Sequence, residues 1–293
     1  MNRYKRSKAV DNFMTGVFYL VAGFFLLLLL VFALYVIIKG FSGASKEMFT
    51  FSRKGIMNQF FNTIYLVFLA LLFSCPIGIG AGIYLSQYAK PGKLTSAIQM
   101  SIETLSSLPS IIVGLFGYLV FILMTGMKWN LFAGALACSI LCLPLITSTV
   151  FDALKALPEH YALGSYGLGA TKRQTIVRVL IPACTSRIMT GVILAAGRCF
   201  GEAAALLYTA GMSTDINWYN WNITSPTCPL NPFRPGETLS LHIWASFSES
   251  TALNAKDIAN LSSAILMLLV LTFNLGVRVM ASNIDKKALG KTK

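Results

Sequence analysis

The chain has 293 residues, of which 55% are hydrophobic and only 12% charged, and its mean hydropathy is +0.67. Soluble domains carry about 25% charged residues, so this composition excludes an ordinary soluble protein and indicates a chain that crosses a membrane several times. The formal net charge of +13 is then a topology signal and an attraction to anionic membrane lipid. Aromatic and basic residues do not interleave as in a nucleic-acid groove, so we expect no nucleic-acid partner.

Apolar runs long enough to cross a bilayer core of about 30 Å define the predicted elements. The basic start of the chain precedes an apolar run that is longer than the core of a cleavable signal peptide, which favours a retained anchor. The third and fourth runs are so close together that they must form a hairpin. Pro76 and Pro144 predict bends inside the second and fourth runs. We therefore predict an all-α polytopic membrane protein with six transmembrane helices, over 17–38, 63–85, 104–127, 129–151, 188–210 and 258–281.

The positions of lysine and arginine set the expected orientation, because cytoplasmic connections carry an excess of both. The richer set of connections holds Arg3, Lys5, Arg6, Lys8, Lys90, Lys93, Lys155, Lys172, Arg173, Arg178, Arg187, Lys286, Lys287, Lys291 and Lys293. The poorer set holds Lys39, Lys46, Arg53, Lys54, Lys128, Arg234 and Lys256. This distribution predicts a multi-pass protein of the plasma membrane with both termini in the cytoplasm.

The predicted cytoplasmic loop, residues 152–187, is rich in small residues. A helix start is expected at Pro158 and Glu159, and a second short helix over 172–180 should stop before Pro182. Glycines at positions 164, 167 and 169 expose backbone or turn the chain. By itself this pattern describes an amphipathic loop that lies on the membrane or inserts into a partner.

The predicted external loop, residues 211–257, combines aromatic residues with several prolines. Its aromatic residues form either a docking surface or an interfacial aromatic belt, and the sequence favours neither. They are Trp218, Tyr219, Trp221, Trp244 and Phe247.

Several patterns argue against chemistry in this chain. The tail 290–292 resembles the end of a phosphate-binding loop, but Asp285 stands where the leading glycine belongs, so we expect no ATP site. His160 and His242 fall on opposite sides of the membrane in this topology, which makes a histidine-based metal or catalytic site improbable. The cysteines should be small buried hydrophobic side chains; they are Cys75, Cys138, Cys142, Cys184, Cys199 and Cys228.

Arg198 and Glu202 are the unusual pair, because they lie in the middle of the fifth apolar run. At this spacing on a helix they share one face, and the cost of charge in a bilayer requires that face to point inward. One interpretation is an internal ion pair that fixes helix packing; the other is a functional site, since charged residues inside a membrane are often functional. Gly197 and Gly201 have the spacing that lets a partner helix approach closely.

Two segments carry a family resemblance. In the cytoplasmic loop, Gly169, Val179, Ile181 and Pro182 match the signature of the coupling loop of ATP-binding cassette (ABC) importer permeases, although 163–165 lack its Glu-Ala-Ala. The sequences LGATKRQTI, LPSIIVGLFGY and GRCFGEAAALLYTAG are similar to those of PstA-type permeases of the high-affinity phosphate ABC importer, in order and spacing over nearly the whole chain.

This resemblance implies a single permease domain over 1–293 with the type I ABC importer fold, which imports inorganic phosphate and is not an enzyme. Arg198 and Glu202 would line the substrate path. The implied contacts to the ATPase are Gly164, Ser165, Gly167, Gly169, Ala170 and Pro182. The implied partners are a homologous PstC-type permease, a PstB-type ATPase dimer that binds ATP and Mg²⁺, and an external PstS-type phosphate-binding protein; this chain itself needs no cofactor.

Three alternatives remain open at this point. The same machine could carry sulfate or molybdate, which the chemistry of an arginine and a glutamate also permits. An ion-coupled secondary transporter or channel could use Glu202 as its proton site. A non-transporting assembly or sensor subunit would bind the partners but tolerate the loss of Arg198.

Overall fold

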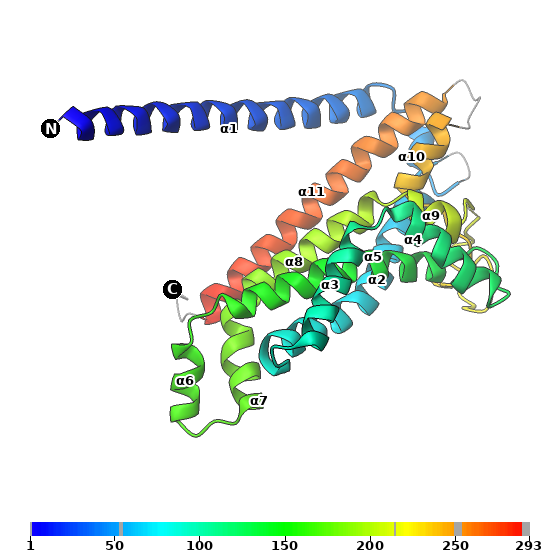
Figure 1. Ribbon diagram of the computed structural model, residues 1–293. Helices are drawn as coiled ribbons and strands as arrows, with labels where there is room; N and C mark the ends of the chain where they lie inside the picture. Colours follow the sequence, from blue (N-terminus) through cyan, green and yellow to red (C-terminus); the bar gives the residue numbers. More distant parts are fainter. Residues whose placement is uncertain (1, 53–54, 214, 249–253, 289–293) are drawn as a thin grey trace.

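The computed structural model describes residues 2–52, 55–213, 215–248 and 254–288, and within these ranges every regular element is helical (Figure 1). The helices are α1 (Asn2–Ser42), α2 (Met57–Ile83), α3 (Lys93–Ser107), α4 (Ser110–Gly117), α5 (Leu131–Lys155), α6 (His160–Gly167), α7 (Lys172–Thr175), α8 (Ile181–Gly201), α9 (Ala204–Thr209), α10 (Leu239–Ser248) and α11 (Ala255–Ala288). Shorter turns are η1 (Lys46–Phe49), η2 (Tyr84–Tyr88), η3 (Tyr118–Leu123) and η4 (Ile176–Leu180). The predicted all-α class is confirmed. Arg53, Lys54, Lys291 and Lys293, used above for orientation, lie outside the described residues.

Five of the described helical spans are long and apolar enough to cross a membrane. The pair 93–107 and 110–123 is bent by 99° and makes a sixth if the two parts form one broken span rather than a re-entrant loop. The centre of the bundle is formed by α5, which packs between α2 and α8, while α11 lies along α8. A Cβ atom on Gly82 of α2 would lie 2.6 Å from Val150 of α5. The glycine therefore permits the close helix approach that membrane interiors use for packing.

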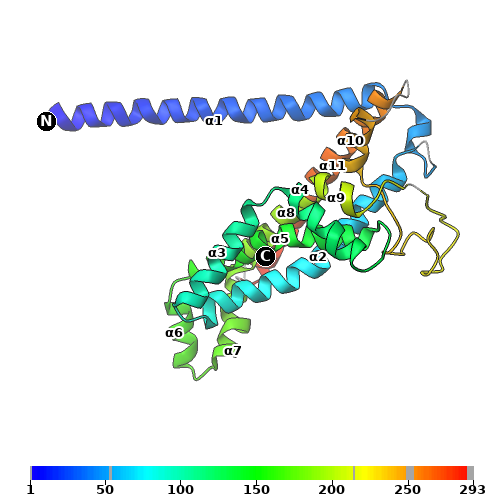
Figure 2. The ribbon, with the colours of Figure 1, turned by 45° about the vertical axis from the view of Figure 1, so that its right-hand side comes forward.

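Helix α1 stands apart from the bundle (Figures 1 and 2). Its C-terminal end meets the start of α11, where Gly40 contacts Ala264 and Gly43 lies against Asp257. Over most of its length its large apolar side chains are exposed, Phe18 and Leu26 among them. Helices α6 and α7, from the loop 152–187, project from one end of the bundle, and α4, α9 and α10 lie toward the other (Figures 1 and 2).

The third apolar run is not one straight helix. Helix α3 ends at Ser107, α4 begins at Ser110, and the two are bent by 99°. Pro109 causes the break, because it has no backbone N–H and pushes the residue before it out of the helical region. Leu108 accordingly has an extended ψ of 133°.

A second proline, Pro182, does not end a helix: the predicted helix stop before it, in the loop predicted to be cytoplasmic, is wrong. Residues from Lys172 to Gly201 form one continuous helical span of 30 residues. The π-helical turn η4 precedes Pro182, and the Ile181 N–H donates to the Ile176 carbonyl, one residue further back than in an α-helix. This wider turn places Pro182 in the first turn of α8, where a missing N–H is tolerated.

The fifth apolar run is interrupted at its outer end. Helix α8 stops at Gly201, Glu202 has an extended ψ of 121°, and α9 resumes at Ala204. Pro76 and Pro144 lie inside α2 and α5, which continue through them. The bends expected at these two prolines stay a prediction.

Gly114 should tolerate no side chain, because a Cβ atom there would lie 2.7 Å from the Cα atom of Ala205 in α9. We expect Gly114→Ala to lower the free energy of unfolding by about 1–3 kcal/mol through overpacking. Gly80→Ala is the matched control, since a Cβ atom at Gly80 meets nothing within 4 Å. Denaturant unfolding of the detergent-purified protein compares the two variants; equal stability would contradict the close α4–α9 packing.

Candidate functional site

Arg198 and Glu202 lie at the interruption of the fifth run, and both are half-buried. The expected helical pairing is wrong, because the helix ends one residue before Glu202. The Glu202 carboxylate instead accepts a hydrogen bond from the Ala205 N–H, 3.2 Å away, at the start of α9. Among the described residues no ion pair joins Arg198 to a carboxylate. A half-buried guanidinium in a membrane-spanning helix thus lacks an acidic partner within the described part of this chain.

The surroundings of Arg198 leave one side of α8 open. A Cβ atom on Gly197 or Gly201 would meet nothing within 4 Å. Elsewhere α8 packs against α5, and the residues next to Arg198 along the chain on that buried side include Cys199, which is 3% exposed. The small-residue face of α8 is therefore available to another helix or to a ligand beside the arginine.

The end of α6 is fixed by its own backbone. The predicted start is confirmed, with Glu159 as the N-cap residue. At the other end, the Gly169 N–H donates to the Tyr166 carbonyl at 2.9 Å, and the Ala170 N–H donates to the Ser165 carbonyl at 3.2 Å. Gly169 has φ +79°. This is the Schellman arrangement, in which glycine adopts the left-handed conformation just beyond the helix.

The next helix starts immediately with a capping box. The Thr171 hydroxyl accepts from the Gln174 N–H at 3.3 Å, and the Gln174 side chain accepts from the Thr171 N–H at 2.8 Å. Together the two motifs satisfy the backbone groups on both sides of a very short connection. The shape of the α6–α7 hairpin is therefore set by local sequence.

Side-chain contacts then attach this hairpin to the bundle. The hydroxyls of Ser165 on α6 and Thr175 on α7 lie 2.9 Å apart, and Thr175 is fully buried. The Lys172 ammonium lies 4.7 Å from the ring centroid of Tyr88, which follows α2. Ser165, one of the residues predicted to couple to the ATPase, thus faces inward and supports the hairpin.

The outer surface of α6 is apolar. Leu168 is 91% exposed and Leu163 64% exposed, and the rings of Tyr161 and Tyr166 are also exposed. Of the other predicted coupling residues, Gly164, Gly167 and Gly169 present open backbone with nothing within 4 Å of an added Cβ atom, and Ala170 is half-buried. Pro182 is exposed in the first turn of α8, away from the tip of the hairpin. The sequence analysis did not predict the exposed side chain of Leu168. The one feature of the sequence that indicates it is the position of Leu168 directly before Gly169, the glycine that ends α6.

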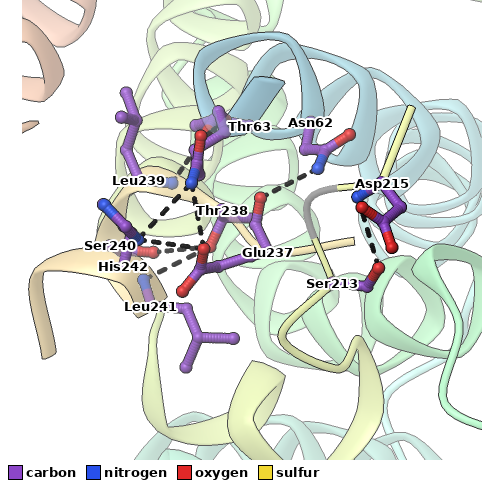
Figure 3. A network of polar contacts seen from close by, with 11 residues as sticks. Asn62, Thr63, Ser213, Asp215, Glu237, Thr238, Leu239, Ser240, Leu241 and His242 are labelled. Carbon is purple, nitrogen blue, oxygen red and sulfur yellow. Dashed lines mark hydrogen bonds and ion pairs between the residues drawn. The ribbon is translucent and has the colours of Figure 1, made fainter. Parts of the chain in front are cut away.

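A buried polar network joins the predicted external loop, residues 211–257, to α2 (Figure 3). Glu237 is 5% exposed; its carboxylate lies 2.9 Å from His242 Nδ1 and accepts from Gln59 Nε2 at 3.1 Å. The Ser240 hydroxyl donates to the Glu202 carbonyl at 2.6 Å. The external loop is therefore hydrogen-bonded to the interruption beside Arg198, a connection that no sequence spacing indicated.

Arg234 holds the external loop together from inside. It is 1% exposed, and its guanidinium donates to the side chain of Asn62 at 2.5 Å and to the carbonyls of Pro229 and Pro235 at 3.3 Å. Burial lowers the pKa of Arg234 to about 10, which still leaves it charged at neutral pH. Its partners are neutral oxygens, so the loop is centred on a buried cation.

We expect Arg234→Met to lower the free energy of unfolding by about 2–4 kcal/mol, because three buried oxygens lose their donor. Denaturant unfolding in detergent measures the change. Lys46→Met is the control, since Lys46 is an exposed cation near the same end of the molecule. Equal stability of the two variants would contradict a supporting role for Arg234.

The aromatic residues of the predicted external loop differ in their exposure to solvent. Trp218 points inward: its indole N–H donates to Asn58 Oδ1 at 3.0 Å, and its ring packs edge-on against Phe51 and Phe61. Tyr219 and Trp221 project outward and are 96% and 65% exposed. Trp244 and Phe247 are also exposed, at 37% and 57%, so every ring of the predicted set except Trp218 is accessible. The docking surface and the interfacial aromatic belt both stay predictions.

Comparison with known proteins gives a consistent assignment. Residues 74–290 match the family "Binding-protein-dependent transport system inner membrane component". The chain is 41% identical over 294 residues to "Probable ABC transporter permease protein YqgI" of Bacillus subtilis (strain 168), covering 98% of this chain and 99% of the relative. It is 30% identical over 251 residues to "Phosphate transport system permease protein PstA" of Xylella fastidiosa (strain 9a5c), covering 84% and 83%.

Solved structures share the fold at low sequence identity. A bacterial alginate ABC transporter in complex with a periplasmic protein aligns with a TM-score of 0.64 at 15% identity, covering 94% of this chain and 96% of that one. The MetNI methionine ABC transporter, in an inward-facing conformation, aligns with a TM-score of 0.57 at 17% identity, covering 82% and 99%. The predicted ABC importer permease fold is confirmed. The chain belongs to the family of binding-protein-dependent transport system inner membrane components, and it is a permease subunit of an ABC importer and not an enzyme.

Proposed function

We propose that this permease subunit conducts inorganic phosphate, as the PstA-type subunit of its transporter. The observation that carries the proposal is Arg198, a half-buried guanidinium in a membrane-spanning helix with no acidic partner in the described part of the chain. Such a charge is costly unless a ligand, water or a partner chain meets it. Relatives named as phosphate permeases, about 30% identical to this chain, support phosphate as that ligand.

The proposed role of Arg198 follows from the chemistry of phosphate. Guanidinium donates parallel hydrogen bonds to two phosphate oxygens and stays charged in a low-dielectric site. The Glu202 carboxylate, held at the start of α9 by the Ala205 N–H, would accept a phosphate hydroxyl and offset part of the positive charge. The anion is then bound weakly enough to leave, as transport requires.

The α6–α7 hairpin is the proposed contact with the ATPase. Its apolar surface around Leu163 and Leu168 suits a groove on a PstB-type ATPase dimer, which would bind ATP and Mg²⁺. Closure of that dimer would move α8 as a rigid body, because α7, η4 and α8 form one helical span. The open face of α8 at Gly197 and Gly201 would receive a PstC-type permease.

We place both termini and the loop 152–187 in the cytoplasm and the loop 211–257 outside the plasma membrane. Lys172, Arg173 and Arg178 lie at the α7 end of the bundle, in agreement with the positive-inside rule. Tyr219 and Trp221 are then positioned to contact an external PstS-type phosphate-binding protein, since exposed aromatic rings are enriched in such interfaces.

Radiolabelled uptake in cells that lack this gene tests the proposal. Under phosphate limitation, the wild-type gene should restore phosphate uptake, and depletion of ATP should abolish it. Unlabelled sulfate and molybdate are the competitors. If the gene restores uptake of sulfate or molybdate but not of phosphate, that oxyanion is the substrate and the phosphate proposal is wrong. Uptake that survives ATP depletion would contradict an ATP-driven mechanism.

A further inference from the structure

Two cysteine thiols meet where α5 packs against α8. The sulfur atoms of Cys142 on α5 and Cys199 on α8 lie 2.9 Å apart, and the two residues are 0% and 3% exposed. Cys138, one turn earlier on α5, is also fully buried. The sequence predicts that the cysteines are small buried hydrophobic side chains. Burial alone does not explain why two of the sulfur atoms lie in contact.

We propose that Cys142 and Cys199 are an oxidisable pair, and that their disulfide fixes α8 to α5 beside Arg198 and arrests transport. The arrest of transport rests on the proposed function; the formation of the cross-link does not. A disulfide has its sulfur atoms about 2.05 Å apart. The two sulfur atoms therefore need to approach each other by only about 1 Å.

The chemistry needs a two-electron oxidant. Each thiol loses its proton and the pair loses two electrons, so that one S–S bond replaces two S–H bonds and two protons leave. Copper(II) phenanthroline, a cationic complex with hydrophobic ligands, supplies the oxidation: two Cu(II) ions are reduced to Cu(I), and oxygen restores them. Because the thiols are buried, the thiolate forms reluctantly and a water-soluble oxidant should react slowly.

The location explains why a cross-link should stop transport. Pro144, which removes one backbone hydrogen bond from α5, lies two residues after Cys142. The interruption of α8 at Glu202 lies three residues after Cys199. A disulfide would therefore tie together the two helices at the points where each has an irregular backbone, next to the guanidinium proposed to bind the substrate.

The experiment treats membranes that contain the assembled transporter with copper(II) phenanthroline. Mass spectrometry of the non-reduced digest should find the Cys142 and Cys199 peptides linked. Phosphate uptake by the vesicles should fall at least tenfold and recover with dithiothreitol. Absence of the linked peptide, or full uptake by fully linked protein, would overturn the proposal.

Cysteine variants provide the controls. Cys199→Ser and Cys142→Ser should each abolish the Cys142–Cys199 link and protect uptake from the oxidant. Cys228→Ser, in the external loop, should behave as wild type. If reduced wild-type vesicles take up no phosphate, the proposed substrate is wrong; ATP hydrolysis by the assembled complex then reports the arrest, and its persistence after full cross-linking would overturn the inference.

Discussion

Replacing Arg198 by alanine should reduce phosphate uptake about 100-fold, because a pair of charge-assisted hydrogen bonds contributes about 2–3 kcal/mol to binding. The protein should still assemble, since no ion pair among the described residues depends on this guanidinium. The measurement is radiolabelled uptake in vesicles, normalised to the amount of assembled transporter.

Arg198→Lys is the matched variant. Lysine keeps the charge but lacks the planar fork that binds two oxygens at once, so uptake should be intermediate between the wild type and the alanine variant. Normal uptake by an assembled Arg198→Ala protein would show that the arginine serves packing against a neighbouring helix. A loss of assembly in both variants would lead to the same conclusion.

Replacing Gly169 by valine should prevent the ATPase from binding while the permease pair still forms. The residue has φ +79°, a conformation that a β-branched side chain adopts only at high cost. The turn that ends α6 would have to rearrange, and the apolar surface around Leu168 would lose its orientation. Co-purification with the ATPase measures the effect, and we expect a loss of at least about tenfold, which corresponds to 1.4 kcal/mol.

Gly169→Asn separates backbone conformation from the loss of glycine itself. Asparagine tolerates the left-handed region, so this variant should retain most of the ATPase. Wild-type recovery of the ATPase by Gly169→Val would contradict the role of the turn. Equal loss in both variants would point to direct steric contact at this position.

Much of the fold could be predicted from the sequence, because the length of an apolar run and the cap residues of a helix are local properties. The spans and the start of α6 at Glu159 follow from them. The effect of a proline cannot be predicted from local sequence in the same way. Pro109 separates two helices, whereas a π-helical turn accommodates Pro182 within one helical span. The difference depends on how the preceding turn packs.

The interruption at Glu202 had no local signal, since glutamate and alanine are good helix formers. What accompanies it is a distant partner, the Ser240 hydroxyl, which donates to the Glu202 carbonyl. The network of Gln59, Glu237 and His242 joins residues up to 183 positions apart. Such pairings depend on the tertiary arrangement, and a single sequence does not reveal them.

The helical span from Lys172 to Gly201 also connects the two ends of the molecule at which different partners are proposed to bind. At 30 residues it is about 45 Å long, with the α6–α7 hairpin at one end and the hydrogen bond to Ser240 next to the other. Linkage between sites is reciprocal. If a nucleotide bound to a partner at the hairpin end changes the affinity for a protein at the Ser240 end, that protein changes the affinity for the nucleotide by the same factor. Nucleotide affinity measured with and without a protein bound at the Ser240 end would give the coupling free energy between the two ends of this helical span.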